Sequence, residues 1–278
     1  MEIEIDFTKS AQENAEKYFE EAKKFKKKAE NLEEEIKKTE EELKREVKPE
    51  IKKPEIKKRK PRGKWYESYR WMFTTEGFLV IGGKDARQNE AIFAKRLEQN
   101  DIVLHADIHG APLVVVKAEK DRTPTALAIR EAGEFAAAYS SAWKAGLGEV
   151  DVYWVKPEQV SKSPPAGQYL PKGSFMIYGE KNYLRKMELK LSIGVKFEVN
   201  KEGQRVAKVI AGNTQSVNKH AKYFVTIVPG SIEPSTISKE IKRQLLIKAL
   251  PDDKPLIEEV PEEDIAKLLP PGNSMLVK

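Results

Sequence analysis

The stretch that decides the fold runs from residue 77 to residue 112 and reads GFLVIGGKDARQNEAIFAKRLEQNDIVLHADIHGAP. Its opening apolar run predicts a β-strand that ends at the turn Gly82-Gly83. Residues 86–98 have the pattern of a helix, and Asp85 stands where a helix N-cap is expected. A second apolar run predicts another strand over residues 101–108. The stretch therefore predicts a strand, a turn, a helix and a strand in succession.

The pattern continues on the C-terminal side of this stretch. A helix capped by Thr123 or Thr125 is expected to run to about Lys144. The resulting order of strands and helices predicts an α+β domain over residues 64–186, with a mostly antiparallel sheet and flanking helices. Further strands and helices predict a small α+β extension over residues 187–278. The further strands of the first domain are expected over residues 113–117, 150–155 and 174–178.

A long helix is predicted on the N-terminal side, where residues 9–45 contain no glycine or proline. Apolar side chains recur there at alternating spacings of three and four, as in a coiled coil, which is the domain expected over residues 1–46. A solvent-exposed charged helix is the alternative. One helix cannot bury its own seam, so its partner would come from a second copy, giving a homodimer, or from other sequence. The seam residues are Ala15, Tyr18, Ala22, Phe25, Ala29, Leu32, Ile36, Thr39 and Leu43.

A basic linker is predicted over residues 47–63, where Pro49, Pro54 and Pro61 exclude a continuous helix. Over residues 47–64, nine Lys and Arg stand against two Glu. An extended, basic segment of this kind is suited to contact a phosphate backbone. A merely solvated linker explains the composition equally well.

The composition limits the class of protein. The chain has 278 residues and no cysteine, so a disulfide framework is excluded and a cytoplasmic location is the simplest interpretation. The sequence has no signal peptide and no apolar run of about 18 residues, so no membrane partner is expected. Charged residues make up 34% of the chain, a share typical of hyperthermophile proteins.

Two of the three histidines stand in the second strand of the opening stretch, in the run His105-Ala106-Asp107-Ile108-His109. Alternate residues of a strand share one face, so His105, Asp107 and His109 are expected to point the same way. The opposite face would carry the apolar residues Leu104, Ala106 and Ile108. A row of three titratable side chains on one face indicates either a site or a polar network.

Several interpretations of this triplet compete. A shared metal ion needs ligand atoms within about 2.0–2.2 Å, whereas the outer two residues of such a strand lie roughly 13 Å apart, so no metal site is expected. A hydrolytic dyad needs a nucleophile, and no Gly-x-Ser-x-Gly or similar motif is present. Recognition of a polymer such as RNA is the functional interpretation that is left. A hydrogen-bonded network without a ligand is the alternative.

A second candidate lies at Gly82-Gly83-Lys84-Asp85, between a strand and a helix, where phosphate-binding turns occur. The spacing of a P-loop or of a dinucleotide-binding motif is absent. Lys84, Arg87 and Asn89 could still present donors to a nucleic acid, and an ordinary turn with a helix cap is the alternative. The long loop over residues 158–173 carries Lys162, and long loops in compact domains are often functional.

These segments together resemble the NFACT-R domain of the NFACT family. The opening residues 5–19 resemble the start of the family's middle coiled coil. The resemblance covers residues 1–185 and fades beyond them, in a region where archaeal members also carry extra sequence. The blocks that carry it are Lys64-Trp65-Tyr66-Glu67, residues 77–85, Gln88-Asn89-Glu90, residues 101–112 and residues 160–177.

The NFACT family comprises factors of ribosome-associated quality control, among them the RqcH and NEMF proteins, and some members bear the older name fibronectin-binding protein A. The resemblance implies RNA recognition rather than an enzyme, without a cofactor. The expected partners are tRNA and the large ribosomal subunit that carries a stalled peptidyl-tRNA. An adhesin-like protein-binding module is the alternative, and a metal-dependent hydrolase that uses the His-x-Asp-x-His strand is a third.

The family's N-terminal NFACT domain and helix-hairpin-helix region have no counterpart in the sequence, so the chain is expected to be the C-terminal half of a longer protein. The resemblance implies phosphate contacts for the basic site residues. It implies that the remaining site residues fix local geometry or read RNA edges. The expected site comprises Lys84, Asp85, Arg87, Asn89, His105, Asp107, His109 and Lys162.

Overall fold

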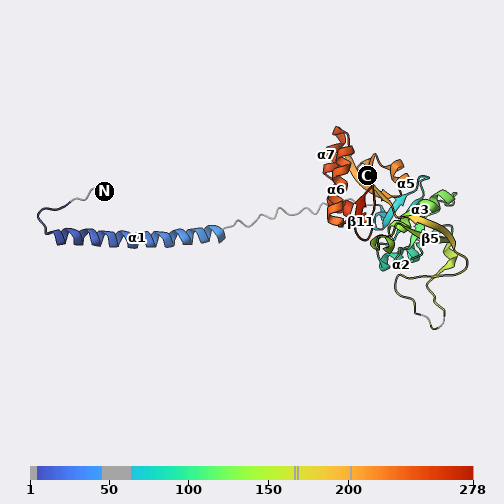
Figure 1. Cartoon of the computed structure of the whole chain (residues 1–278), viewed down its shortest axis with the longest axis horizontal. Coiled ribbons are helices and arrows are strands. Elements are labelled where there is room, and N and C mark those ends of the chain that lie inside the picture. The colour runs from blue at the N-terminus through green and yellow to red at the C-terminus, as the bar shows by residue number, and fades with distance from the viewer. Residues whose placement is uncertain (1–4, 46–63, 166, 168, 201, 278) are drawn as a thin grey trace. The chain divides into compact units, whose positions relative to one another are not determined.

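The structure is a computed structural model that describes residues 5–45, 64–165, 167, 169–200 and 202–277 (Figure 1). The chain divides into two units, residues 1–63 and residues 64–278. The linker predicted over residues 47–63 lies outside the described residues. In the described ranges no helix is long and apolar enough to cross a membrane.

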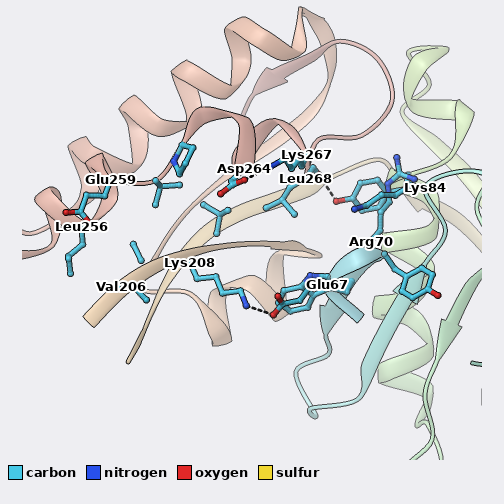
Figure 2. Close-up of a pocket in the computed structure, with 17 residues that line it drawn as sticks. Glu67, Arg70, Lys84, Val206, Lys208, Leu256, Glu259, Asp264, Lys267 and Leu268 are labelled. Atoms are coloured by element: carbon cyan, nitrogen blue, oxygen red, sulfur yellow. Dashed lines mark hydrogen bonds and ion pairs between the residues drawn. The ribbon is translucent and has the colours of Figure 1, made fainter. Parts of the chain in front are cut away.

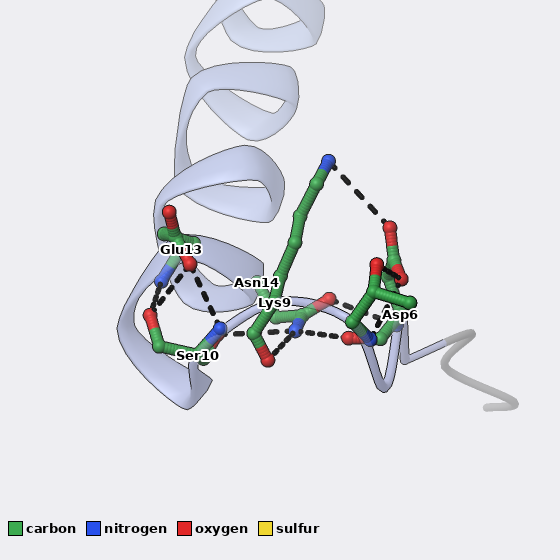
Figure 3. A network of polar contacts seen from close by, with 6 residues as sticks. Asp6, Lys9, Ser10, Glu13 and Asn14 are labelled. Atoms are coloured by element: carbon green, nitrogen blue, oxygen red, sulfur yellow. Dashed lines mark hydrogen bonds and ion pairs between the residues drawn. The ribbon is translucent and has the colours of Figure 1, made fainter.

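The first unit contains helix α1, Ala11–Arg45, which confirms the long helix expected from the apolar spacing. Its start is fixed by a capping box. The amide of Ser10 donates to Oε2 of Glu13 at 2.8 Å, and the amide of Glu13 donates to Oγ of Ser10 at 3.2 Å. Asn14 extends the network, because its side chain exchanges hydrogen bonds of 3.0 and 2.9 Å with the backbone of Asp6 (Figure 3).

The apolar side chains of α1 from Phe19 to Ile36 are exposed. Phe25, Leu32 and Ile36 of the predicted seam are 69%, 49% and 56% exposed. Nothing in the described part of the first unit covers them. An uncovered apolar seam is expected of a coiled-coil helix in the absence of its partner helix. Pairing of two chains through α1 stays a prediction.

The second unit is built around a six-stranded sheet in the order β1-β2-β4-β3-β5-β8. All its neighbouring strands run antiparallel. This arrangement, with its flanking helices, confirms the predicted α+β class. The strands are β1 (Arg70–Phe73), β2 (Leu79–Gly82), β3 (Ile102–Ala106), β4 (Val114–Val116), β5 (Glu149–Val155) and β8 (Asn182–Glu188).

The alternation of side chains along β3 separates the two faces of this sheet. Leu104 belongs to the larger hydrophobic core, which also contains the buried side of α3. Val103 belongs to a smaller core on the opposite face, together with Tyr153 of β5 and Ile92 of α2. His105 pairs with Tyr153 in the register of β3 and β5, so its side chain lies on this second face.

A second sheet of four antiparallel strands follows in the order β10-β9-β11-β12. Its buried residues, such as Ile193 and Ile227, belong to the same larger core as Leu104. Its strands are β9 (Leu191–Val199), β10 (Arg205–Gly212), β11 (Tyr223–Ile232) and β12 (Ser274–Leu276), and a separate pair is formed by β6 (Val160–Ser161) and β7 (Met176–Ile177). The helices of the unit are α2 (Ala86–Lys95), α3 (Ala126–Ala138), α4 (Ser141–Lys144), α5 (Thr214–His220), α6 (Pro234–Lys248), α7 (Lys254–Glu258) and α8 (Glu262–Ala266).

Two aromatic side chains join the C-terminal segment to the helices of the first sheet. The hydroxyl of Tyr139 donates to the carbonyl of Leu268 at 2.6 Å. The indole of Trp143, which is buried, donates to the carbonyl of Asn273 at 3.0 Å. Residues before and after position 186 thus share one hydrophobic core, and the division into domains at 64–186 and 187–278 stays a prediction.

The helix expected to run to about Lys144 is interrupted. α3 ends at Ala138, and a second helix, α4, begins at Ser141. The break has a local cause, because the hydroxyl of Ser140 accepts a 3.2 Å hydrogen bond from the amide of Ala142 and so caps the new helix.

Candidate nucleic-acid interface

An open cavity of about 620 Å³ lies against the sheet face that carries His105, and we call it the histidine cavity. Its walls come from the sheet, the N-terminal end of α2 and the loop at residues 171–175. It contains five of the eight site residues predicted from the sequence, Lys84, Asp85, Asn89, His105 and His109. The three that do not line it are Arg87, Asp107 and Lys162.

The turn Gly82-Gly83 sets the N-terminal end of α2 close to the sheet. A β-carbon on Gly83 would lie 2.0 Å from Oδ1 of Asn89, so only glycine fits there. That oxygen accepts a 3.2 Å hydrogen bond from the amide of Leu113. Asp85 caps α2, as predicted, by accepting a 2.8 Å hydrogen bond from the amide of Gln88. Asp85 and the amide oxygen of Asn89 therefore hold the wall of the cavity in place.

His105 and Tyr153 line the cavity from adjacent strands, with ring centroids 5.8 Å apart. Burial lowers the pKa of His105 below its usual value, so the imidazole is neutral at pH 7. Its Nδ1 is buried and has no hydrogen-bond partner among the described residues. Burial also raises the pKa of Tyr153 to about 12, so the phenol keeps its proton.

Two exposed lysines, Lys84 and Lys172, stand at the cavity. Within the described ranges neither forms an ion pair. Burial, followed by repulsion from Arg70 and Lys267, lowers the pKa of Lys84. Arg87 lies outside the cavity lining on α2, where it is exposed and likewise lacks an ion pair to any described residue. These three cations are available to an anionic ligand.

Lys162 has a partner inside the protein. Its ammonium lies 2.7 Å from Oε1 of Glu90 and 4.7 Å from the ring centroid of Phe175. The same Glu90 oxygen accepts a 3.0 Å hydrogen bond from the amide of Gly173. Gly173 has φ +81°, and a β-carbon there would lie 2.5 Å from Cβ of Ala86. Glu90 of α2 thus binds both Lys162, which follows β6, and Gly173 of the 171–175 loop.

The predicted row of three polar residues is only partly regular. β3 ends at Ala106, and Gly110 turns the chain with φ +85°. His109 lines the cavity, whereas Asp107 is exposed and lies 3.4 Å from the hydroxyl of Tyr183. No group of three or more His, Cys, Asp or Glu among the described residues is arranged to hold a metal ion.

Arg70 is a cavity residue that the sequence did not single out. Its guanidinium lies 4.6 Å from the ring centroid of Tyr139 and donates to the carbonyl of Gly83 at 3.0 Å. Its Nε is buried without a hydrogen-bond partner in the described part of the chain. Burial lowers the pKa of this guanidinium. No local pattern marks Arg70 as a site residue, because it reaches the cavity only through the pairing of β1 with β2.

Arg70, Lys84 and Tyr139 also line a second cavity, of about 410 Å³, which we call the lysine cavity. Figure 2 shows that the two lysines that line only this cavity are paired: Lys208 contacts Glu67, and Lys267 lies 2.6 Å from Asp264. The two cavities are therefore neighbours with a common wall but with different electrostatics.

The fold and the histidine cavity coincide with a known domain. Residues 68–179 match the family model described as "NFACT protein RNA binding domain". Nearly all residues of the histidine cavity fall within this range, the exception being Pro271.

Whole-sequence comparisons agree with this match. Over 222 residues the chain is 38% identical to the archaeal Rqc2 homolog aRqcH of Methanocaldococcus jannaschii. This alignment covers 80% of the chain and 31% of that protein. Over 208 residues it is 34% identical to the ribosome quality control complex subunit NEMF of Mus musculus, covering 73% of the chain and 19% of that protein. A solved structure of the C-terminal part of the fibronectin/fibrinogen-binding protein from Streptococcus suis is 22% identical, with a TM-score of 0.37 over 66% of this chain and 78% of that one.

The chain spans only 31% and 19% of the length of these two curated relatives. On these matches, the chain belongs to the NFACT family and carries that family's RNA-binding domain.

Proposed function

We propose that this chain is the RNA-binding part of a ribosome-associated quality-control factor, which acts in the cytoplasm on large ribosomal subunits that carry a stalled peptidyl-tRNA. The observation that carries the proposal is the histidine cavity, an open polar site with unpaired cations in an RNA-binding domain. The names of the relatives, which are ribosome quality control subunits, supply the biological setting.

The electrostatics of the site favour a polyanion. Lys84, Arg87 and Lys172 are exposed and form no ion pair with described residues, so phosphate groups can neutralise them without breaking an internal contact. Each phosphate contact releases counterions, so affinity should fall steeply with salt. The neutral His105 and the protonated Tyr153 add hydrogen-bonding groups without adding charge. The function follows from binding and requires no catalytic group.

The test is sedimentation of the full chain with purified large ribosomal subunits, with and without peptidyl-tRNA, over a series of salt concentrations. The chain should co-sediment at low salt, more strongly when peptidyl-tRNA is present. The triple variant Lys84→Gln, Arg87→Gln, Lys172→Gln should lose most of this binding.

The matched control is the triple variant Lys120→Gln, Lys239→Gln, Lys254→Gln, which removes the same charge from exposed positions outside both cavities. It should bind like the unaltered chain. Equal binding by the two triple variants, or no binding at low salt, would overturn the proposal. Retention on immobilised fibronectin without binding to subunits would instead support the adhesin alternative.

A further inference from the structure

The histidine cavity is lined by several polar groups that form no hydrogen bond to the described residues. Asn89 uses its side-chain oxygen to bind Leu113, but its Nδ2 group forms no hydrogen bond to the described residues. The hydroxyl of Tyr153 has no hydrogen-bond partner there either, and Nδ1 of His105 is unpartnered. Buried or half-buried polar groups are normally satisfied by protein, water or ligand. Two buried atoms without a partner among the described residues, Nδ1 of His105 and Nε of Arg70, thus lie on the lining, and the accessible groups of Asn89 and Tyr153 stand beside them, so the cavity offers several free hydrogen-bonding groups to a ligand with polar edges.

The remaining lining has the character of a site for a flat, partly apolar group. Phe175, Ile177 and Pro112 supply apolar surface, and Tyr153 supplies an aromatic ring. The volume of about 620 Å³ lies within the range of roughly 300–1,000 Å³ usual for small-molecule sites. A nucleobase combines flat apolar faces with hydrogen-bonding edges, so it matches both kinds of lining.

The charges have a complementary arrangement. The one carboxylate on the cavity, that of Asp85, is engaged as the cap of α2. His105 is neutral, the guanidinium of Arg70 is half-buried, and the ammonium groups of Lys84 and Lys172 are exposed. Neutral donors and acceptors on the lining suit a base, while exposed ammonium groups suit the phosphates on either side of it.

We propose that the histidine cavity receives the base of one unpaired nucleotide of RNA, with Lys84 and Lys172 on the neighbouring phosphates. This inference rests on the proposed RNA-binding function and specifies its ligand. A base that is paired inside a duplex has its edge engaged and its faces stacked, so it cannot enter a cavity. Unpaired bases in loops, bulges and ends are the parts of RNA that proteins commonly recognise in this way.

The test compares two RNA hairpins of equal length and charge, one fully paired and one with a single bulged 2-aminopurine. The full chain should bind the bulged hairpin about tenfold more tightly, and 2-aminopurine fluorescence should change on binding because the base leaves its stacked environment. A 3′-overhang hairpin distinguishes an unpaired end from an internal bulge as the preferred source of the base.

Two variants locate the effect in the cavity. Ser174→Phe, which adds a ring at the cavity lining, should lower binding to the bulged hairpin to the level of the paired hairpin. Ser163→Phe is its matched control, because Ser163 is an exposed loop residue outside the lining. Tyr153→Phe, which removes only the hydroxyl, should weaken the preference about threefold. Thermal unfolding of each variant verifies that the fold is intact.

The outcomes separate the two proposals. If the unaltered chain binds neither hairpin at low salt, the proposed RNA-binding function fails. If it binds both hairpins equally, with the expected salt dependence, only the nucleotide cavity is overturned. An unchanged preference in both Ser174→Phe and Tyr153→Phe would likewise overturn it.

Discussion

The two neighbouring cavities share Arg70, Lys84 and Tyr139, and Lys84 forms no ion pair to a described residue in either, but the lysines that line only one cavity differ in their pairing. In the lysine cavity, Lys208 is paired with Glu67 and Lys267 with Asp264. In the histidine cavity, Lys84 and Lys172 have no ion-pair partner within the described residues. If the histidine cavity binds RNA as proposed, the pairing of the cations indicates a binding site better than their number does. A paired lysine is engaged within the fold, whereas an unpaired one is available to a ligand.

The largest effect is expected from Gly83→Ala, which adds a β-carbon only 2.0 Å from Oδ1 of Asn89. Overpacking of this kind should lower the free energy of unfolding by about 1–3 kcal/mol. Because Asn89 must move, RNA affinity should fall as well. Urea denaturation and RNA titration measure the two effects. Gly148→Ala is the control, since a β-carbon there meets nothing within 4 Å. Equal stability of the two variants would show that the close approach is not rigid.

Removing charge from each cavity in turn should separate binding from stability. Lys84→Gln with Lys172→Gln should lower RNA affinity about tenfold and reduce the slope of log affinity against log salt by about 1.4. Lys208→Gln with Lys267→Gln should leave affinity within about twofold and lower stability by about 1 kcal/mol or less. Titration at four salt concentrations and urea denaturation of both pairs measure this. The contrast between the cavities is refuted if both pairs lose affinity equally.

Lys162 allows a finer distinction, because the sequence predicts a phosphate contact and the structure gives it an internal partner, Glu90. If its role is to hold the 171–175 loop, Lys162→Ala should weaken RNA binding about threefold without changing the salt slope. Glu90→Gln, which removes no positive charge, should have the same effect. A reduced salt slope in Lys162→Ala together with normal binding by Glu90→Gln would favour the phosphate contact.

The smallest effect concerns pH. Burial lowers the folded pKa of His105, so the unfolded chain binds more protons at this residue between the lowered value and the ordinary value near 6.5. The contribution of His105 to stability is therefore present above the ordinary value and is lost as pH falls through the interval. His105→Gln should flatten the dependence of unfolding free energy on pH in this range. An identical pH profile in the variant would mean that His105 is equally solvated in both states.

Local features of the fold could be predicted from the sequence because their causes are local. Asp85 caps α2 through a residue three positions away, and the apolar alternation of β3 marks its two faces. The break between α3 and α4 was missed, because a capping serine inside an apolar helical pattern competes with continued helix only in the folded context. Which strands pair could not be inferred, so the contributions of Arg70 and Tyr153 to the cavity were missed as well.

In the candidate site, too, local contacts could be predicted from the sequence and long-range contacts could not. Five predicted residues meet in one cavity because they lie in a short stretch around β2, α2 and β3. Lys162 contacts Glu90, which lies 72 positions away in the sequence, and no spacing rule predicts a contact at that sequence separation. Asp107 departs from the predicted row because β3 ends one residue before it. The functional role of each of these residues stays a prediction.

The contacts of Tyr139 and Trp143 with the C-terminal segment have a consequence for synthesis of the protein. Trp143 is 1% exposed, and its indole donates to the carbonyl of Asn273, 130 positions later. While the chain emerges from the ribosome, α3 and α4 are made long before the C-terminal residues that Tyr139 and Trp143 contact. The larger core therefore cannot reach its final packing during elongation of its own first half, and the hydrogen bond of Trp143 forms only after Asn273 has left the exit tunnel.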